Sequence, residues 1–168
     1  RHKFCGGRMN HYCDAKMPMS SLARLGLAGQ LTNHQFEMHN GFRDWDKRHE
    51  YCKTVSWAVF TYEYLNSLAR MLKGRKVVEV CAGHGTLATH MQARGLDWTA
   101  TDALPPLQNH VIKMRAIRAV KYYRPEVIFA SWIPYESTLD FKLAKMGKPL
   151  ILVGEGCGGC TGSNRLEE

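Results

Sequence analysis

Hydrophobic and polar positions between residues 76 and 153 alternate between short apolar runs and amphipathic segments. The apolar, β-branched runs predict buried strands at 76–82, 97–101, 111–115, 127–131 and 149–153. The amphipathic segments predict helices at 86–94, 116–123 and 138–146, with Gly95 and Gly147 just beyond two of the helix ends. One longer helix from Pro106 onward is the alternative for residues 103–124. Strands that alternate with helices predict an α/β fold built on a doubly wound, mostly parallel sheet.

The segment that precedes the sheet has a different pattern. Residues 1–48 are rich in Gly, Asn, His and Met, and one short helix is expected there from Ser20 to Leu27, with a serine cap and with Gly29 at its end. From His49 to Lys73, apolar residues recur at spacings of three and four, which predicts a helix with one buried face. The residues of this stripe are Tyr51, Val55, Ala58, Tyr62, Leu65, Ala69 and Leu72. We therefore expect an N-terminal helical cap or lid over residues 1–48 and a cofactor-binding domain over residues 49–168.

Composition narrows the class of protein. A chain of 168 residues with 45% hydrophobic residues is long enough to bury one core. Its formal net charge of +8 favours an anionic partner such as nucleic acid, but the basic residues are scattered in pairs and triplets, so a solvated basic surface explains them equally well.

No apolar run reaches the roughly 18 residues that a membrane span needs, and the N-terminus lacks the apolar segment of a secretory signal. We therefore expect a cytoplasmic protein with free thiols and no membrane association.

A glycine-rich turn follows the first predicted strand. Gly83 and Gly85 allow the backbone to approach a ligand closely, and the helix that starts at Thr86 offers free N–H groups at its beginning. The spacing Gly-x-Gly-x-x-Ala also fits a dinucleotide site, so a nicotinamide-dependent oxidoreductase is one alternative.

Two acidic residues occupy the carboxyl ends of predicted strands. Glu79 lies in an otherwise apolar strand, where a buried carboxylate is costly without a partner. The ammonium group of a sulfonium amino acid is one such partner, and a basic side chain such as Arg75 or an N-terminal Lys is the alternative. Asp102 ends the next strand, where its carboxylate can accept hydrogen bonds from both hydroxyls of a ribose. The alternative for Asp102 is a helix cap before Pro105.

The combination of Glu79-x-x-x-Gly83-x-Gly85 with Asp102 resembles the first two motifs of the class I, Rossmann-like S-adenosylmethionine-dependent methyltransferases, over about residues 49–155. The resemblance implies that Glu79 serves the methionine moiety, that the glycine loop passes beneath the cofactor, and that Asp102 binds ribose. Two departures are that Cys81 replaces the usual first glycine and that Arg115 replaces an acid often found near the end of the third strand. The implied cofactor-binding residues are Glu79, Cys81, Gly83, Gly85, Asp102, Ala103, Ser131 and Trp132.

The same resemblance implies a final antiparallel hairpin after the fifth strand. Residues 154–168 alone follow Val153, so we expect this hairpin to be missing. Because an uncovered sheet edge invites pairing with another chain, we expect an oligomer, an edge covered by the N-terminal segment, or a chain that lacks a C-terminal portion.

The stretch SWIPYES, from Ser131 to Ser137, resembles the fourth motif of the same family, in which a polar residue, prolines and an aromatic orient an amine. Pro134 and Tyr135 fit this motif, whereas Trp132 stands where the polar residue belongs, so amino-group chemistry is not assigned. The resemblance implies that Trp132, Pro134 and Tyr135 bind the methyl acceptor.

The expected reaction is methyl transfer from S-adenosylmethionine to an unidentified acceptor, with a mild preference for nucleic acid or another anionic substrate. If the acceptor must lose a proton, Tyr135, Glu136 and Glu155 are the candidate catalytic residues. Because the fourth motif is degenerate, a catalytically silent subunit that binds cofactor or RNA is the first alternative.

The cysteines raise the question of a metal site. Cys157 and Cys160 have the spacing of half a zinc site, and Cys5, His11 and Cys13 would have to complete it. Nothing in the sequence requires this arrangement, so we expect no metal.

Overall fold

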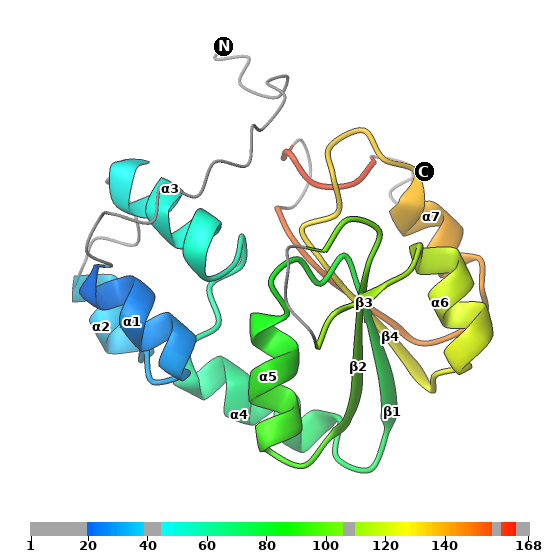
Figure 1. Ribbon diagram of the computed structural model, residues 1–168, viewed down its shortest axis with the longest axis horizontal. Helices are drawn as coiled ribbons and strands as arrows, with labels where there is room; N and C mark the ends of the chain where they lie inside the picture. The colour runs from blue at the N-terminus through cyan, green and yellow to red at the C-terminus, as the bar shows by residue number, and fades with distance from the viewer. Residues whose placement is uncertain (1–19, 39–44, 106–109, 156–158, 164–168) are drawn as a thin grey trace.

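The structure of the chain, a computed structural model, describes residues 20–38, 45–105, 110–155 and 159–163 (Figure 1). Three short helices come first, namely α1 (Ser21–Ala28), α2 (Asn33–Met38) and α3 (Trp45–Thr54), and they lie beside an α/β unit. Helix α1 begins at Ser20, whose hydroxyl accepts the N–H of Ala23, and ends at Gly29 in the left-handed conformation. The sequence prediction for this helix is therefore confirmed.

The α/β unit is built on a parallel sheet. Its strands are β1 (Lys76–Val80), β2 (Asp97–Asp102), β3 (Ile112–Lys113), β4 (Val127–Ser131) and β5 (Leu150–Val153). The five strands have the order β3-β2-β1-β4-β5, and every pairing is parallel. Between β3 and β4 the structure has a separate helix, α6 (Ala116–Tyr123), as predicted, and not the longer helix that was the alternative for residues 103–124.

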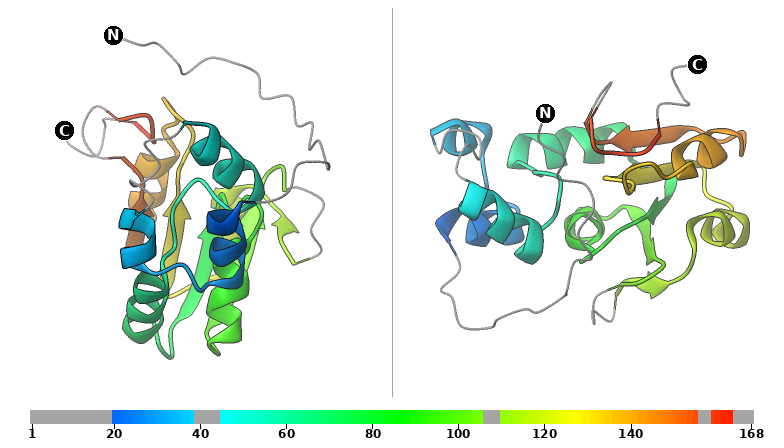
Figure 2. Two further views of the ribbon diagram at one scale, coloured as in Figure 1. Left: turned by 90° about the vertical axis from the view of Figure 1, so that its left-hand side faces the viewer. Right: turned by 90° about the horizontal axis from the view of Figure 1, so that it is seen from above.

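Helices cover both faces of the sheet (Figure 2). Helices α4 (Tyr62–Met71) and α5 (Thr86–Ala93) pack on one face, where Val77 of β1 contributes to the core. Helices α6 and α7 (Leu139–Ala144) pack on the other face, where the next residue, Val78, contributes to a second core. Burial of both faces explains why the central strands β1 and β4 read as nearly continuous apolar runs in the sequence, whereas β3 at the edge of the sheet is exposed. The doubly wound parallel sheet is confirmed, and the fold is Rossmann-like.

The predicted helix from His49 to Lys73 is wrong, because residues 55–61 separate α3 from α4. The backbone of this segment is bonded to distant parts of the chain: the Val55 carbonyl accepts the Thr86 hydroxyl at 2.6 Å, and the Tyr62 N–H donates to the Leu31 carbonyl at 2.7 Å. The Thr61 hydroxyl then caps α4 by accepting the N–H of Tyr64. The apolar stripe is continuous in sequence, yet its first two residues pack in one core and most of the others in a second core. Tyr62, which was predicted to be buried, is 48% exposed.

The N-terminal helices have a small core of their own. Leu22 and Ala23 of α1 and Leu31 pack against Tyr51 and Val55, all of them buried. The boundary drawn after residue 48 falls inside α3, and Tyr51 of that helix contributes to this cluster.

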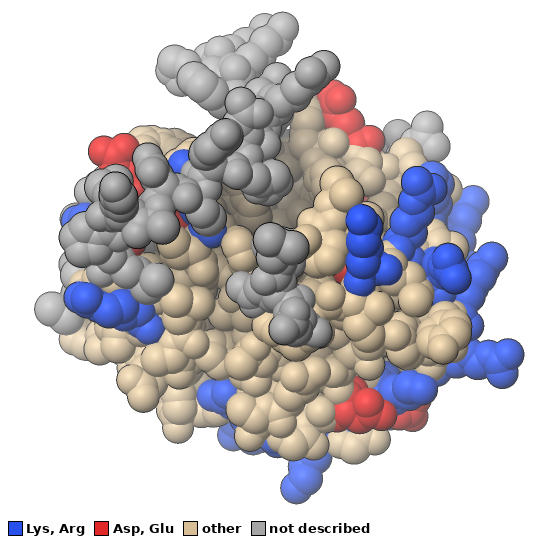
Figure 3. All heavy atoms as spheres, viewed as in Figure 1, with Lys and Arg blue, Asp and Glu red and all other residues tan. Residues whose placement is uncertain are grey.

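Basic side chains gather on one side of the molecule. In the view of Figure 3, Lys and Arg cluster over α6 and α7. Among the described residues, no helix is long and apolar enough to cross a membrane.

Candidate functional site

The chain changes direction at the middle of the sheet, and this places a candidate site at the carboxyl ends of the strands. After β1 the chain enters α5 on one face, whereas after β4 it enters α7 on the other face. Because β1 and β4 are neighbours, the loops that leave them diverge, and a crevice at such a switch point is where open α/β sheets bind ligands. The loops after β1, β2, β4 and β5 all reach this edge of the sheet.

The loop after β1 contains three residues in the left-handed region, with φ of 58° at Cys81, 54° at Gly83 and 72° at Gly85. Cysteine is uncommon in this region. The left-handed backbone at Cys81 therefore explains why a glycine would fit at this position, where the resembled family usually has one. A Cβ at Gly83 would meet nothing within 4 Å, and the backbone there faces open space. A Cβ at Gly85 would clash with Nε2 of His110 and would lie 2.5 Å from Cγ2 of Val111. Packing alone therefore requires glycine at position 85, whereas position 83 leaves room for a ligand.

The Asp102 carboxylate joins the end of β2 to the loop after β1. Its Oδ2 accepts the N–H of Gly83 at 3.0 Å, and its Oδ1 accepts the N–H of Leu104 at 2.8 Å. The second bond closes an Asx turn, so within the described residues Asp102 caps a turn and not a helix. Each oxygen retains a lone pair, and the side chain is half-buried, so it can accept further hydrogen bonds. The neighbouring Ala103 is exposed at the same edge.

Glu79 is buried on the face of the sheet that α4 and α5 cover, and its side chain is 2% exposed. Its Oε2 accepts the indole N–H of Trp98 at 2.8 Å. Burial raises the pKa of Glu79 to about 8, the Trp98 hydrogen bond acts in the opposite direction, and the nearby charge of Asp102 adds to the rise. Burial also raises the pKa of Tyr64, and the charge of Glu79 raises it further. Glu79 is therefore a buried acid with a raised pKa, near the end of β1.

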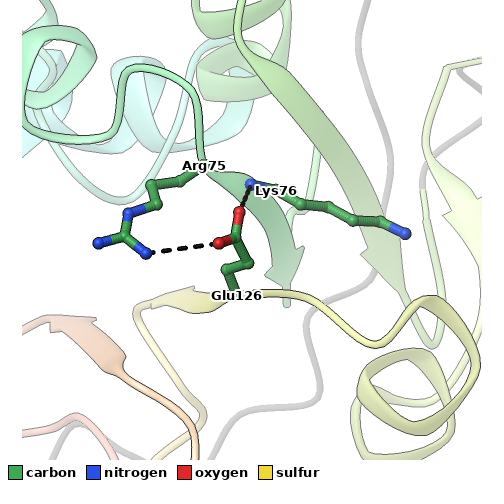
Figure 4. A network of polar contacts seen from close by, with 3 residues as sticks. All are labelled: Arg75, Lys76 and Glu126. Carbon is green, nitrogen blue, oxygen red and sulfur yellow. Dashed lines mark hydrogen bonds and ion pairs between the residues drawn. The ribbon is translucent and has the colours of Figure 1, made fainter.

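Arg75, the alternative partner for Glu79, is engaged elsewhere (Figure 4). It pairs with Glu126 at 3.4 Å, at the amino ends of β1 and β4, while the other oxygen of Glu126 accepts the N–H of Lys76 at 2.9 Å. This network holds the start of the sheet together, and in the structure the charge of Arg75 is used there and not at Glu79.

The loop after β4 carries an aromatic contact that the sequence did not indicate. Ser131 is buried at the end of the strand, and Trp132 follows it with φ of 50° and donates its N–H to the Val153 carbonyl at 2.7 Å. The Trp132 ring lies 5.8 Å from the ring of Trp57, and the guanidinium of Arg48 lies 5.3 Å from the Trp132 centroid. Arg48 also donates to the Trp57 carbonyl at 2.6 Å. Helix α3 is thereby attached to the candidate site, and no sequence motif marks Arg48 or Trp57 for this role.

The predicted acceptor residues lie farther along the same loop. All three are exposed, namely Pro134, Tyr135 and Glu136, and 48% of the Tyr135 surface is accessible to solvent. Glu136 has φ of 60°, so the loop turns sharply at this residue. These three side chains are exposed to solvent, whereas Trp132 in the same loop is half-buried.

The loop after β5 is folded back on itself. The Glu155 carboxylate accepts the N–H of Cys160, and the Glu155 N–H donates to the Thr161 hydroxyl at 2.9 Å. Farther on, Asp140 of α7 accepts the N–H of Ser163 at 2.8 Å. Glu155 therefore closes its own loop, and buried Asp140, which sequence reasoning missed, anchors the loop to α7.

The residues that were considered as zinc ligands lie mostly outside the part of the chain that the structure describes. Cys5, His11, Cys13 and Cys157 fall outside the described residues, and Cys160 is exposed. Within the ranges that the structure describes, no three His, Cys, Asp or Glu side chains cluster as metal ligands would.

Comparisons with protein families, with curated proteins and with solved structures find no match to this chain. Its function is therefore inferred from the chemistry of its own residues.

Proposed function

We propose that the carboxyl edge of the sheet binds S-adenosylmethionine and that the chain transfers its methyl group to an anionic acceptor. The observation that carries the proposal is the position of Asp102, at the end of β2 and bonded to Gly83 in the loop after β1. A nucleoside at this edge would place its ribose over Gly83, within reach of that carboxylate.

The donor and acceptor groups present suit such a ligand. Asp102 retains lone pairs for two ribose hydroxyls, and the open space beside Gly83 admits a close approach to the backbone. Glu79 lies one strand away from Asp102, in register with Ala100 of β2. A ligand ammonium group at the end of β1 would favour the ionised form of Glu79 and offset part of the cost of its burial.

When bound, the cofactor would supply an electrophilic methyl carbon on its sulfonium centre, and the residues of this chain would position the acceptor. Trp132 is held by Trp57 and Arg48 and would form the floor against which a planar acceptor stacks. Tyr135 and Glu136 are exposed on the rim, where either can take a proton from the acceptor. Glu155 is the weaker candidate, because its carboxylate already accepts the N–H of Cys160.

The test is calorimetric titration with S-adenosylhomocysteine. The informative variant is Asp102→Asn, and the matched control is Asp97→Asn, an exposed residue at the opposite end of the same strand. We expect wild type and Asp97→Asn to bind equally and Asp102→Asn to bind about tenfold more weakly, a loss of about 1.4 kcal/mol. If wild type does not bind S-adenosylhomocysteine, the proposed cofactor is wrong. If all three proteins bind it equally, the proposed position of the site at Asp102 is wrong.

A second candidate function is a silent binding subunit, and the packing of Trp132 favours it. The indole occupies the place where amino-methylating members of the resembled family carry a polar residue, and it is in contact with Arg48 and Trp57. Cofactor binding without turnover on nucleic-acid, protein or small-molecule acceptors would establish this function. The five-strand order is shared with dinucleotide-binding folds. Binding of NAD at this site, without binding of S-adenosylhomocysteine, would therefore indicate an oxidoreductase.

A further inference from the structure

The charged side chains of segment 103–125 are all basic. The segment contains Lys113, Arg115, Arg118, Lys121 and Arg124 and no Asp or Glu. All five basic side chains are exposed. Among the residues that the structure describes, the ion pair found joins Arg75 to Glu126, so none of the five is neutralised in this way. Their charge is available to a partner.

The fold gathers this charge on one surface. Helix α6 buries Ala119 and Val120 against the sheet, so the opposite side of the helix faces solvent. Arg118 and Lys121 are three residues apart and lie on that outer side. Figure 3 shows basic side chains over this helix. We define the α6 surface as Lys113, Arg115, Arg118, Lys121, Tyr122 and Arg124.

The α6 surface also carries an exposed aromatic ring. Tyr122 is 69% exposed, and its ring lies edge-on to Tyr123, with centroids 4.9 Å apart and an interplanar angle of 83°. Tyr123 is half-buried and packs on the core beneath the helix. The contact orients Tyr122 on the surface, and an exposed aromatic among cations is what stacking on an unpaired base requires.

The α6 surface begins beside the candidate site. Lys113 of β3 is in register with Asp102 of β2, and the N–H of Met114 donates to the Asp102 carbonyl at 2.8 Å. From there α6 leads away along the outside of the sheet. Its 8 residues span about 12 Å.

We propose that the α6 surface binds single-stranded nucleic acid, with the cations on the phosphates and Tyr122 stacked on a base. An acidic peptide would use the cations but leave Tyr122 without a specific role, so the exposed ring favours nucleic acid. This inference rests on charge and exposure, and its test involves no cofactor, so it stands or fails separately from the proposed methyl transfer.

A second group of cations provides two of the three control positions. A groove of about 640 Å³ lies at the amino-terminal edge of the sheet, and Arg70, Lys73 and Arg94 line it together with Glu63. Arg94 donates to Asn66 at 3.1 Å, and Arg70 donates to Ser67 at 3.3 Å. Because these arginines make local bonds beside an acid, this group is the poorer site for a phosphate chain.

The experiment is fluorescence anisotropy with a labelled single-stranded oligonucleotide of about ten nucleotides, between about 50 and about 200 mM salt. The test variant is Arg118→Ala/Lys121→Ala/Arg124→Ala. The control, Arg24→Ala/Arg70→Ala/Lys73→Ala, removes the same charge from exposed positions elsewhere. We expect the test variant to weaken binding at least about tenfold and to lower the salt slope by about 2, while the control stays near wild type. Equal losses in both variants, or no binding by wild type, would overturn the proposal.

Tyr122 separates nucleic acid from other anions. Tyr122→Ala should weaken oligonucleotide binding by about tenfold with an unchanged salt slope, and Tyr122→Phe should restore it. A poly-glutamate peptide or vesicles rich in phosphatidylserine should compete poorly. Competition as effective as that of unlabelled oligonucleotide would identify the surface as a general anion site and would overturn the assignment to nucleic acid.

Discussion

The carboxylate of Asp102 accepts the backbone N–H of Gly83 at 3.0 Å and so joins the end of one strand to the loop that follows its neighbour. This single contact brings together the two sequence motifs that suggested a nucleoside site. It also gives Asp102 a structural role that is measurable without any ligand.

Replacement of Asp102 should therefore affect stability as well as binding. Asp102→Ala removes the acceptor of two backbone N–H groups and should lower the free energy of unfolding by about 2 kcal/mol. Asp97→Ala, on the exposed end of the strand, should change it by less than about 0.5 kcal/mol. Urea unfolding with and without S-adenosylhomocysteine measures both effects. If the ligand stabilises Asp102→Ala as much as wild type, Asp102 does not hold the nucleoside.

Glu79 should make the protein less stable as the pH rises. Its pKa is raised from 4.5 to about 8 in the folded protein, so its contribution to stability is fully present below about 4.5 and is lost as the pH rises through about 8. Glu79→Gln keeps an acceptor for Trp98 and cannot ionise, so it should be more stable than wild type near pH 8, by roughly 4 kcal/mol, and similar to it near pH 5.

Urea unfolding at several pH values checks this prediction. The control is Glu126→Gln, because Glu126 is exposed and its pKa is lowered, chiefly by the hydrogen bond from Lys76. That variant should keep the decline in stability between about pH 5 and about pH 8. An unchanged pH dependence in Glu79→Gln would show that another group is responsible.

His90 should produce the opposite dependence at acidic pH. It is buried between α5 and α1, with Nε2 at 3.2 Å from the Gly26 carbonyl, and burial lowers its pKa. Its contribution is present above the ordinary pKa of about 6.5 and is lost as the pH falls toward the lowered value. His90→Gln should remove this acid sensitivity and cost about 1 kcal/mol at neutral pH. Thermal unfolding between about pH 7 and pH 5 measures this loss of stability. The control is His49→Gln, because His49 is exposed and the variant should lose stability at acidic pH as wild type does.

The two glycines of the loop after β1 should respond differently to alanine. Gly85→Ala meets His110 and Val111 and should cost at least about 2 kcal/mol, with or without ligand. The methyl group of Gly83→Ala would lie in open space, so this variant should lose only about 1 kcal/mol of unfolding free energy, because alanine is disfavoured in the left-handed backbone. The same methyl group would, however, lie where the ligand approaches. Unfolding and titration together measure this. Ligand binding unaffected by Gly83→Ala would show that the nucleoside does not lie over this loop.

Much of the fold could be predicted from the sequence because its signals are local. Strand β4 and helix α6 have the predicted bounds, since buried parallel strands need continuous apolar runs and helices need amphipathic ones. The cap at Ser20 and the stop at Gly29 are equally local. The candidate acids were found for the same reason: Glu79 and Asp102 interrupt apolar runs near strand ends.

Only the tertiary structure decided the features that depend on distant residues. The break at 55–61 arises from bonds to Leu31 and Thr86, which no helical period can reveal. The need for glycine at position 85 comes from His110, and the setting of Trp132 comes from Arg48 and Trp57. The sequence by itself determined which segments become strands and helices and which acids lie at their ends. The strand order, and therefore which loops meet at the site, was decided by packing between segments that are far apart in the chain.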